Sequence, residues 1–341
     1  MTLTPAASFT ADEVGDGMPL FAPTRERVAH LLEFVPQSGE TVIGEVPPAN
    51  GTLTYSVAAA NAAMTGCTPP EFWLVTEVLA AVLGGEFNLL SIQATTHPAG
   101  PVILVSGPVA AQLGVHGGSG CMGPGWPVNA RVGRAVRLAL MNVGGARPGG
   151  LDMATFGGPA KWSLCFSDQP VDVEANRWPT LAEEQTGSPD TSTVTVIGGE
   201  GPLNVNDHFS TRATGLLRMI AHTLATVGSN HAHNPRSTPM VVIGAEHAAV
   251  IAGDGFTRDD ARAFIARHAR IPLSQWSKEA RDGRLRNRYP KLYGDADDQD
   301  EVAVVAPEDL VLAVAGGPGK HSVVIPSFGR SVSVREIRLP A

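Results

Sequence analysis

The chain has 341 residues, of which 43% are hydrophobic and 17% charged, with 38 glycines and 27 prolines. This composition is typical of a loop-rich globular protein rather than a disordered or coiled-coil one. The formal net charge of -8 argues against a general binder of nucleic acid or of acidic membranes, because either would need a basic surface. The first residues show no signal-peptide pattern and no run of about 18 apolar residues occurs, so we expect a cytoplasmic protein with no membrane contact.

The cysteines bear on the redox environment of the chain. Cys67, Cys121 and Cys165 are odd in number and far apart in the sequence. That pattern fits reduced thiols better than a disulfide framework. At least one thiol could then be reactive.

After an expected N-terminal arm and first helix in residues 1–49, the chain repeats itself. Residues 51–83 (GTLTYSVAAANAAMTGCTPPEFWLVTEVLAAVL) resemble residues 192–224 (STVTVIGGEGPLNVNDHFSTRATGLLRMIAHTL). Each segment predicts a short strand, a loop rich in Gly, Ala or Asn, and an amphipathic helix with apolar residues at helical spacing. Aligned without a gap, Cys67 falls on His208.

A second block follows in each half. The segment from His97 (HPAGPVILVSGPVAAQLG) resembles the segment from His233 (HNPRSTPMVVIGAEHAAVIAG). Each predicts a His-containing loop, a buried strand (102–105 and 240–243), a glycine turn and an Ala-rich helix.

The third block is short, and its two copies match most closely. Residues 157–163 (GGPAKWS) and 316–322 (GGPGKHS) share Gly, Gly, Pro, Lys and Ser in register. The spacing from the second block to the third is longer in the second half, so we expect a surface insertion there, assigned to the charged stretch 278–301. Between the halves, the polar residues 169–191 have the composition of a linker.

These repeats predict an α/β fold that is internally duplicated, with two similar α/β halves related by pseudo-symmetry and with parallel or mixed sheets. The first repeat is placed at 50–168, the second at 192–330 and a C-terminal tail at 331–341. Ligands of open α/β sheets bind at the carboxyl ends of the strands, and we expect the active site in the cleft between the halves.

Cys67 is the first candidate catalytic residue. It precedes Thr68-Pro69-Pro70-Glu71 at an expected helix start, where free N–H groups and the helix dipole favour a thiolate. We therefore expect a nucleophile whose pKa falls from about 8.5 towards neutrality. The structural alternative is a small buried hydrophobic residue.

His208 occupies the corresponding place in the second half, within the polar run Asn206-Asp207-His208. His208 is expected to act as a general base or metal ligand, with Asp207 beside it in the catalytic set and Asn206 contacting substrate. The alternative is that these residues serve as turn and helix-capping groups.

Histidines also precede the second-block strands. His97 follows Thr96 in the first half, and His231 and His233 lie in the matching loop of the second half. Histidine at corresponding places favours an acid–base or ligand role for His97, with Thr96 contacting substrate.

The repeated Gly-Gly-Pro-x-Lys-x-Ser segment suggests a tight turn that brings the backbone close to a ligand, with Lys161 and Lys320 binding a carboxylate or phosphate. The neighbouring Ser163, Ser322 and His321 join them as expected substrate contacts. A structural turn with a solvated lysine would repeat equally well.

No CxxC, HExxH or GxSxG motif occurs in the chain, so zinc-ribbon, zincin and α/β-hydrolase assignments lack their defining signal. A mixed site of Cys67, His97 and His208 still suits a divalent metal ion such as zinc or iron, because those ligand types need not be close in sequence.

Five stretches resemble a known family. They are NAAMTGC (61–67), QATTHPAGPVILVSGP (93–108), LNVNDH (203–208), GAEHAAVIAGDGF (244–256) and HARIP (268–272). They are similar to the large region of the UGSC-type (seleno)protein family, over about residues 25–330, and the resemblance implies a connection to thiol or selenol chemistry. The chain has no Cys-Gly-Ser-Cys motif, so by this resemblance the redox half is missing or lies on another polypeptide.

We therefore expect an enzyme, a lyase or hydrolase, that cleaves or forms a carbon–heteroatom bond in a small anionic substrate bound between the two repeats. The alternative is a substrate-binding subunit of a thiol-redox complex whose catalytic Cys or Sec lies on a separate partner protein. The expected partners are the small substrate and either further copies of the chain or that redox subunit, without nucleic acid or membrane.

Overall fold

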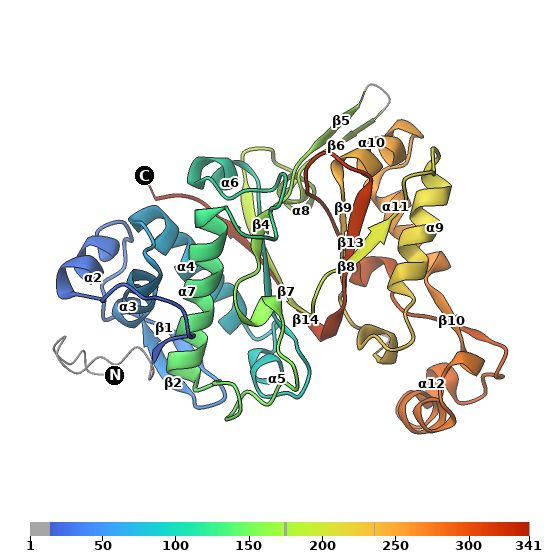
Figure 1. Ribbon diagram of the computed structural model, residues 1–341, viewed down its shortest axis with the longest axis horizontal. Helices are drawn as coiled ribbons and strands as arrows, with labels where there is room; N and C mark the ends of the chain where they lie inside the picture. The colour runs from blue at the N-terminus through green and yellow to red at the C-terminus, as the bar shows by residue number, and fades with distance from the viewer. Residues whose placement is uncertain (1–13, 174–175, 235, 341) are drawn as a thin grey trace. The chain divides into compact units, whose positions relative to one another are not determined.

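The computed structural model describes residues 14–173, 176–234 and 236–340, and Figure 1 labels many of their helices and strands. The first 13 residues of the expected N-terminal arm lie outside this description. The chain forms two compact units. Within the described ranges, no helix combines the length and the apolar character needed to cross a membrane.

The two units interleave along the sequence. Unit 1 runs to Gln169, takes in Pro179–Gly201 and resumes at Ser331, whereas unit 2 consists of Pro170–Trp178 and Pro202–Arg330. Strand β7 (Ser192–Gly199), which the repeat alignment assigns to the second half, therefore belongs to unit 1. The residues expected as a C-terminal tail likewise continue strand β14 (Ser327–Ile337) into the sheet of unit 1.

Unit 1 contains a mixed four-stranded sheet in the order β14-β7-β3-β4. β3 (Gly100–Ser106) pairs antiparallel with β7, from Gly100↔Gly199 to Ser106↔Thr193, and parallel with β4 (Cys165–Ser167). Every residue of β3 is buried, as expected of a continuous apolar run covered on both faces. The expectation of a mixed α/β architecture is confirmed here.

The segment before Cys67 is a helix, where the repeat predicts a loop. α3 (Tyr55–Thr65) begins at Thr54, whose hydroxyl accepts a hydrogen bond from the Val57 N–H at 3.3 Å. It ends at Gly66, whose φ of 77° favours glycine. The alanines of YSVAAANAAMT have high helix propensity, and the expectation of a loop is therefore wrong.

Helix α4 (Pro69–Leu83) begins where the sequence predicts a helix start. The Glu71 carboxylate accepts the Thr68 N–H at 2.8 Å, and prolines occupy the first helical positions. α4 packs on β7 and on α7 (Pro127–Gly144), and α7 packs on β4. The remaining elements of unit 1 are α2 (Arg25–Leu32), β1 (Val42–Val46), β2 (Gly51–Thr54), α5 (Leu89–Gln93), α6 (Pro108–Leu113), η2 (Pro159–Lys161) and α8 (Leu181–Thr186).

Unit 2 has its own mixed four-stranded sheet, in the order β12-β9-β13-β8. β9 (Met240–Ile243) pairs parallel with β12 (Val311–Val314) and antiparallel with β13 (His321–Ile325). β13 pairs in turn with β8 (Leu203–Asn206), again antiparallel. The apolar β9 segment is buried throughout.

Three helices cover the core of unit 2. α9 (Ala213–Leu224) packs on β8 and β13, α10 (Ala245–Gly253) packs on β13, and α11 (Arg258–His268) packs on α9. The expected linker 169–191 contains two antiparallel strands, β5 (Val171–Val173) and β6 (Asn176–Trp178), which pack on α10. The remaining elements of unit 2 are η3 (His231–His233), β10 (Arg270–Pro272), η4 (Leu273–Gln275), η5 (Ala280–Arg286), α12 (Pro290–Tyr293), β11 (Glu301–Ala303) and η6 (Pro307–Asp309).

The charged stretch 278–301 lies outside the four-stranded sheet of unit 2. It holds the π-helical turn η5 and the short helix α12, and β10 and β11 pair antiparallel at its base. Most of its side chains are exposed or half-buried, while Leu285 and Tyr293 are buried and join the core of unit 2. These features are those of a surface segment held by two apolar contacts.

Candidate functional site

The carboxyl ends of three strands meet at one edge of the sheet in unit 2. β12 runs parallel to β9, and β8 and β9 are each antiparallel to the β13 between them. The register pairs His321 with Asn206 and Ser322 with Ile243, so the start of β13 reaches the same edge. Because α/β sheets bind ligands at the carboxyl ends of their strands, we take this edge as the candidate site.

Most of the residues predicted for the second half come together here. Asn206, Asp207 and His208 end β8, while Lys320, His321 and Ser322 begin β13. The His208 and His321 rings lie edge to face with 5.0 Å between their centroids, and both side chains are exposed. The Lys320 Nζ donates a hydrogen bond to the His208 carbonyl at 3.1 Å. Two imidazoles and one ammonium therefore share a small area of surface.

A buried polar network lies beneath these groups. The Ser322 Oγ is 2.9 Å from the His247 Nδ1 and accepts the Gly244 N–H at 3.2 Å, and the His247 Nε2 is 3.0 Å from the Asp207 carbonyl. This set is satisfied when Nε2 carries the proton and Nδ1 accepts the Ser322 hydroxyl, a tautomer assigned from the network. Burial lowers the pKa of His247, in keeping with a neutral ring.

His247 belongs to this candidate site, and the sequence reasoning missed it. It lies in the first turn of α10, which follows β9 directly, so its position after a buried strand and a glycine was the available signal. Its two hydrogen bonds connect β13 to the turn after β8. We infer that His247 holds His208 and His321 near one another.

Asp207 is buried, and its carboxylate organises the turn that carries His208. Its Oδ1 accepts the Phe209 and Ser210 N–H groups at 3.1 and 2.9 Å. Burial raises the pKa of Asp207, but the hydrogen bonds from Ser210 and Phe209 outweigh it and hold that pKa below its usual value. Asp207 therefore acts as an ionised turn-forming group rather than as a proton donor.

One hydrogen bond and one close approach of the backbone position the glycine-rich turn and the start of β13. The Glu246 Oε1 accepts the Gly319 N–H at 2.7 Å, which ties the turn to the first turn of α10. A Cβ on Gly244 would lie 2.0 Å from the His321 carbonyl oxygen. Only glycine permits that close approach of the backbone, so the glycine after β9 lets β13 begin beside it.

The predicted site residues of the first half lie at the opposite edge of their own sheet. Thr96 and His97 precede β3, and Lys161 and Ser163 precede β4. Because β3 and β4 are parallel, these residues gather near the amino ends of the strands. In unit 2 the corresponding block follows β12 and opens β13.

The third block therefore does not mark equivalent positions. Lys161 ends the turn η2 before a parallel strand, whereas Lys320 lies after a parallel strand, in the turn to an antiparallel one. The expectation that Lys161 and Lys320 correspond is wrong. A short Gly-Gly-Pro turn recurs in unrelated connections because its backbone requirements are local.

Lys161 belongs to a buried ion cluster. Its Nζ lies 3.0 Å from both carboxylate oxygens of Asp152, and Asp152 also accepts from the Arg137 Nη2 at 2.8 Å. All three side chains are at most 8% exposed. Burial lowers the pKa of Lys161 despite the nearby Asp152. These contacts give the lysine a structural partner in place of a ligand.

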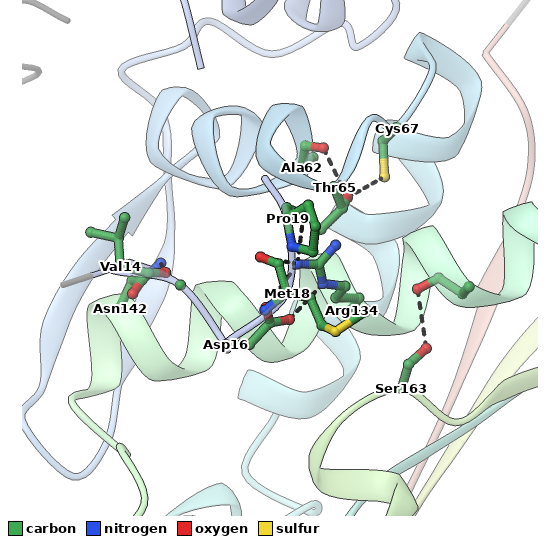
Figure 2. Close-up of polar contacts among 12 residues, drawn as sticks. Val14, Asp16, Met18, Pro19, Ala62, Thr65, Cys67, Arg134, Asn142 and Ser163 are labelled. Carbon is green, nitrogen blue, oxygen red and sulfur yellow. Dashed lines mark hydrogen bonds and ion pairs between the residues drawn. The ribbon is translucent and has the colours of Figure 1, made fainter. Parts of the chain in front are cut away.

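The other first-half candidates also have partners within unit 1. The Thr95 hydroxyl lies 3.2 Å from the His97 Nδ1, and the Thr96 carbonyl accepts the Thr155 N–H at 3.0 Å. The Ser163 hydroxyl donates to the Ala130 carbonyl in α7 at 3.1 Å, a contact drawn in Figure 2. These bonds are those of loop and helix packing.

The environment of Cys67 contradicts an activated thiol. Burial raises the pKa of Cys67 to about 12, opposed only in part by the Thr65 hydroxyl, which lies 3.3 Å from the Sγ (Figure 2). The expected fall of this pKa towards neutrality is wrong, because loss of hydration outweighs the helix start. Cys121 and Cys165 are likewise buried, and burial raises the pKa of Cys165 to about 12.

The expected zinc or iron site receives no support. Among residues 14–173, 176–234 and 236–340, no three His, Cys, Asp or Glu side chains are placed to hold a metal ion, including Cys67, His97 and His208. His231, in the loop matched to that of His97, is fully buried with its Nε2 2.8 Å from the Leu224 carbonyl. Burial lowers its pKa to about 4, so this histidine is a neutral core residue.

Comparison of the chain with protein-family models and with curated proteins finds no match. The candidate site thus rests on its own geometry.

Proposed function

We propose that this protein is an enzyme that cleaves or forms a carbon–heteroatom bond in a small anionic substrate, and that the substrate binds beside His208, Lys320 and His321. The observation that carries the proposal is the convergence of these three groups at the carboxyl ends of β8, β9 and β12. Their position matches the place where α/β sheets bind ligands.

The chemistry follows from the residue types. The Lys320 ammonium binds the anionic group of the substrate as a point charge. Imidazole both accepts and donates protons near neutral pH, so one histidine takes a proton from the substrate carbon or from an attacking water. The other gives a proton to the departing oxygen, nitrogen or sulfur atom. Asn206, which the register pairs with His321, supplies a neutral polar group.

His247 and Ser322 position these groups in the proposed mechanism. Both are 2% exposed, so neither side chain reaches a substrate in the surface turn. Their hydrogen bonds join β13, α10 and the Asp207 carbonyl. A rigid support of this kind keeps acid and base in a productive arrangement.

A binding subunit whose redox thiol lies on a partner is the second candidate. One observation favours it: all three cysteines of the chain are buried, and burial raises the pKa of Cys67. The chain thus offers no activated thiol of its own among the described residues, as a subunit served by a separate thiol protein would. Anion binding without turnover by the isolated chain would favour this candidate.

We also infer that the two units arose by duplication. Each has a central strand, β3 or β9, with a parallel neighbour on one side, β4 or β12, and an antiparallel neighbour on the other, β7 or β13. The fourth strand of each sheet follows an antiparallel strand of the other unit in the chain. β14 completes the sheet of unit 1 and follows β13 of unit 2, and β8 completes the sheet of unit 2 and follows β7 of unit 1. This pattern supports pairing β3 with β9, as the second sequence block does.

The experiment is a binding and turnover screen of the full chain. Small carboxylates, phosphates and sulfonates are tested by calorimetry, and the mixtures are followed by proton NMR for new products. Lys320→Ala should weaken binding of an anion about tenfold or more, because a hydrogen-bonded charge contact is worth about 1.5 to 3 kcal/mol. His208→Asn and His321→Asn should lower turnover more than binding.

The matched control is Lys291→Ala, which removes an exposed lysine from α12. It should leave anion affinity unchanged. Equal losses in the Lys291 and Lys320 variants would indicate a diffuse charge effect and would remove the basis for the site. Full turnover in both histidine variants would remove the proposed acid–base chemistry.

A further inference from the structure

A groove of about 400 Å³ lies on the surface of unit 2, outside the site described above. Helix α11 forms one wall, the insertion helix α12 forms another, and the chain after β11 closes it. Its apolar lining includes Ala263, Ala266, Leu292, Tyr293, Val305 and Pro307.

Leu292 shows that this apolar lining is left uncovered. Leu292 is 58% exposed, whereas the neighbouring Tyr293 is 9% exposed and Leu285 is fully buried. The insertion thus uses Leu285 and Tyr293 for its own attachment to the core and leaves Leu292 at the groove. An exposed leucine costs free energy that an apolar ligand would recover.

Arg267 is the charged residue in the lining of this groove. It makes no hydrogen bond or ion pair with any residue that the structure describes. Neighbouring arginines differ: Arg262 pairs with Asp259 at 2.5 Å and Arg270 with Glu301 at 3.7 Å. Arg267 therefore offers a free guanidinium beside apolar walls.

The same arginine borders an adjoining groove of about 390 Å³, whose lining includes Phe256 and Phe264. The acidic residues there are already engaged. Asp254 pairs with Arg212 at 3.1 Å, and Asp260 caps the start of α11 through Thr257. The apolar surface thus extends on both sides of one unpaired cation.

We propose that this groove binds a small amphipathic carboxylate, an aliphatic chain with a single carboxyl group. The chain would lie against α11 and α12, and the carboxylate would pair with Arg267. Guanidinium binds a carboxylate through two parallel N–H···O bonds, and the aliphatic chain would cover apolar lining that is now exposed to water. A second anionic group would find no partner in the lining, so a monocarboxylate fits best.

The test uses butyrate, hexanoate, octanoate and decanoate, each below its micelle concentration, binding to the full chain by calorimetry. Affinity should rise with each added methylene, by up to about fourfold where the group is fully buried. Decanol, with the same chain and no charge, should bind at least about tenfold more weakly than decanoate.

Variants locate the binding. Arg267→Gln should lower decanoate affinity to that of decanol, while Arg338→Gln, at an exposed arginine of unit 1, should leave it unchanged. Ala263→Trp, on the exposed side of α11, should fill the groove and abolish decanoate binding without lowering the melting temperature.

Lys320→Ala keeps this proposal separate from the proposed function, because it should not alter decanoate affinity. Loss of decanoate binding in that variant, with none in Arg267→Gln, would assign decanoate to the anion site and overturn the groove proposal. Equal affinity for decanol and decanoate, or the absence of a chain-length trend, would overturn it as well.

Discussion

Replacing Asp152 should destabilise unit 1 far more than replacing Lys161. The Asp152 carboxylate is 2% exposed and lies 3.0 Å from the Lys161 Nζ and 2.8 Å from the Arg137 Nη2. It is one anion between two buried cations. Asp152→Asn therefore leaves two desolvated positive charges side by side, and the expected cost is about 3 to 5 kcal/mol of unfolding free energy.

Lys161→Met is the informative counterpart. It leaves the Arg137–Asp152 pair balanced and replaces the lysine stem with an apolar chain of similar length. The lost hydrogen bonds are offset by removing a buried ammonium, so the expected cost is at most about 1 kcal/mol.

Burial of Lys161 should also make the stability of the fold depend on pH. Burial lowers the pKa of Lys161 from its usual 10.5, so between the lowered pKa and 10.5 the unfolded chain binds more protons than the folded one. Stability should therefore rise with pH across that window, and this rise should be missing in Lys161→Met.

Urea unfolding followed by circular dichroism measures both effects. A loss in Lys161→Met as large as that in Asp152→Asn would contradict the reasoning, as would an Asp152→Asn variant that loses less than about 1 kcal/mol. A small loss in Asp152→Asn would mean that the cluster is solvated, and Lys161 would again be a candidate ligand-binding residue. A large loss in Lys161→Met would mean that the Lys161–Asp152 ion pair itself stabilises unit 1.

Two further predictions concern buried titratable groups. Burial lowers the pKa of His231 to about 4, whereas the unfolded ring takes up a proton near pH 6.5. Between pH 6.5 and 4 the free energy of unfolding of the wild type should therefore fall by about 3 kcal/mol more than that of His231→Gln, as measured by urea unfolding at several pH values. Parallel pH profiles of the two proteins would contradict this. Burial raises the pKa of Cys67 to about 12, so iodoacetamide at pH 7.5 should alkylate it at least about a hundredfold more slowly in the folded chain than in urea, as followed by mass spectrometry. Similar rates in both states would restore the case for a reactive thiol.

Local patterns in the sequence determined several elements of the fold. The apolar runs 102–105 and 240–243 predicted buried strands, and they form the central strands β3 and β9 of the two sheets. The Thr68-Pro69-Pro70-Glu71 segment predicted the start of α4. These signals depend on backbone preference and on burial of a continuous run, both of which act over a few neighbouring residues.

Other expectations required knowledge of residues far apart in the chain. Asp207, His208 and Lys320 were predicted as site residues from the sequence, but His247, which joins β13 to the turn after β8, was not. Its role depends on partners 40 and 75 positions away. No pattern within a single helix indicates such partners.

The tertiary structure alone decided what the buried groups do. A helix start favours a thiolate at Cys67, yet burial reverses that preference. Lys161 and Lys320 share one motif, but Asp152 engages Lys161 within unit 1, whereas Lys320 lies beside exposed imidazoles. The sequence determined which charged and nucleophilic groups were present. Hydration and the partner across the fold decided their charge state, because desolvation and Coulomb energies depend on neighbours in space rather than along the chain.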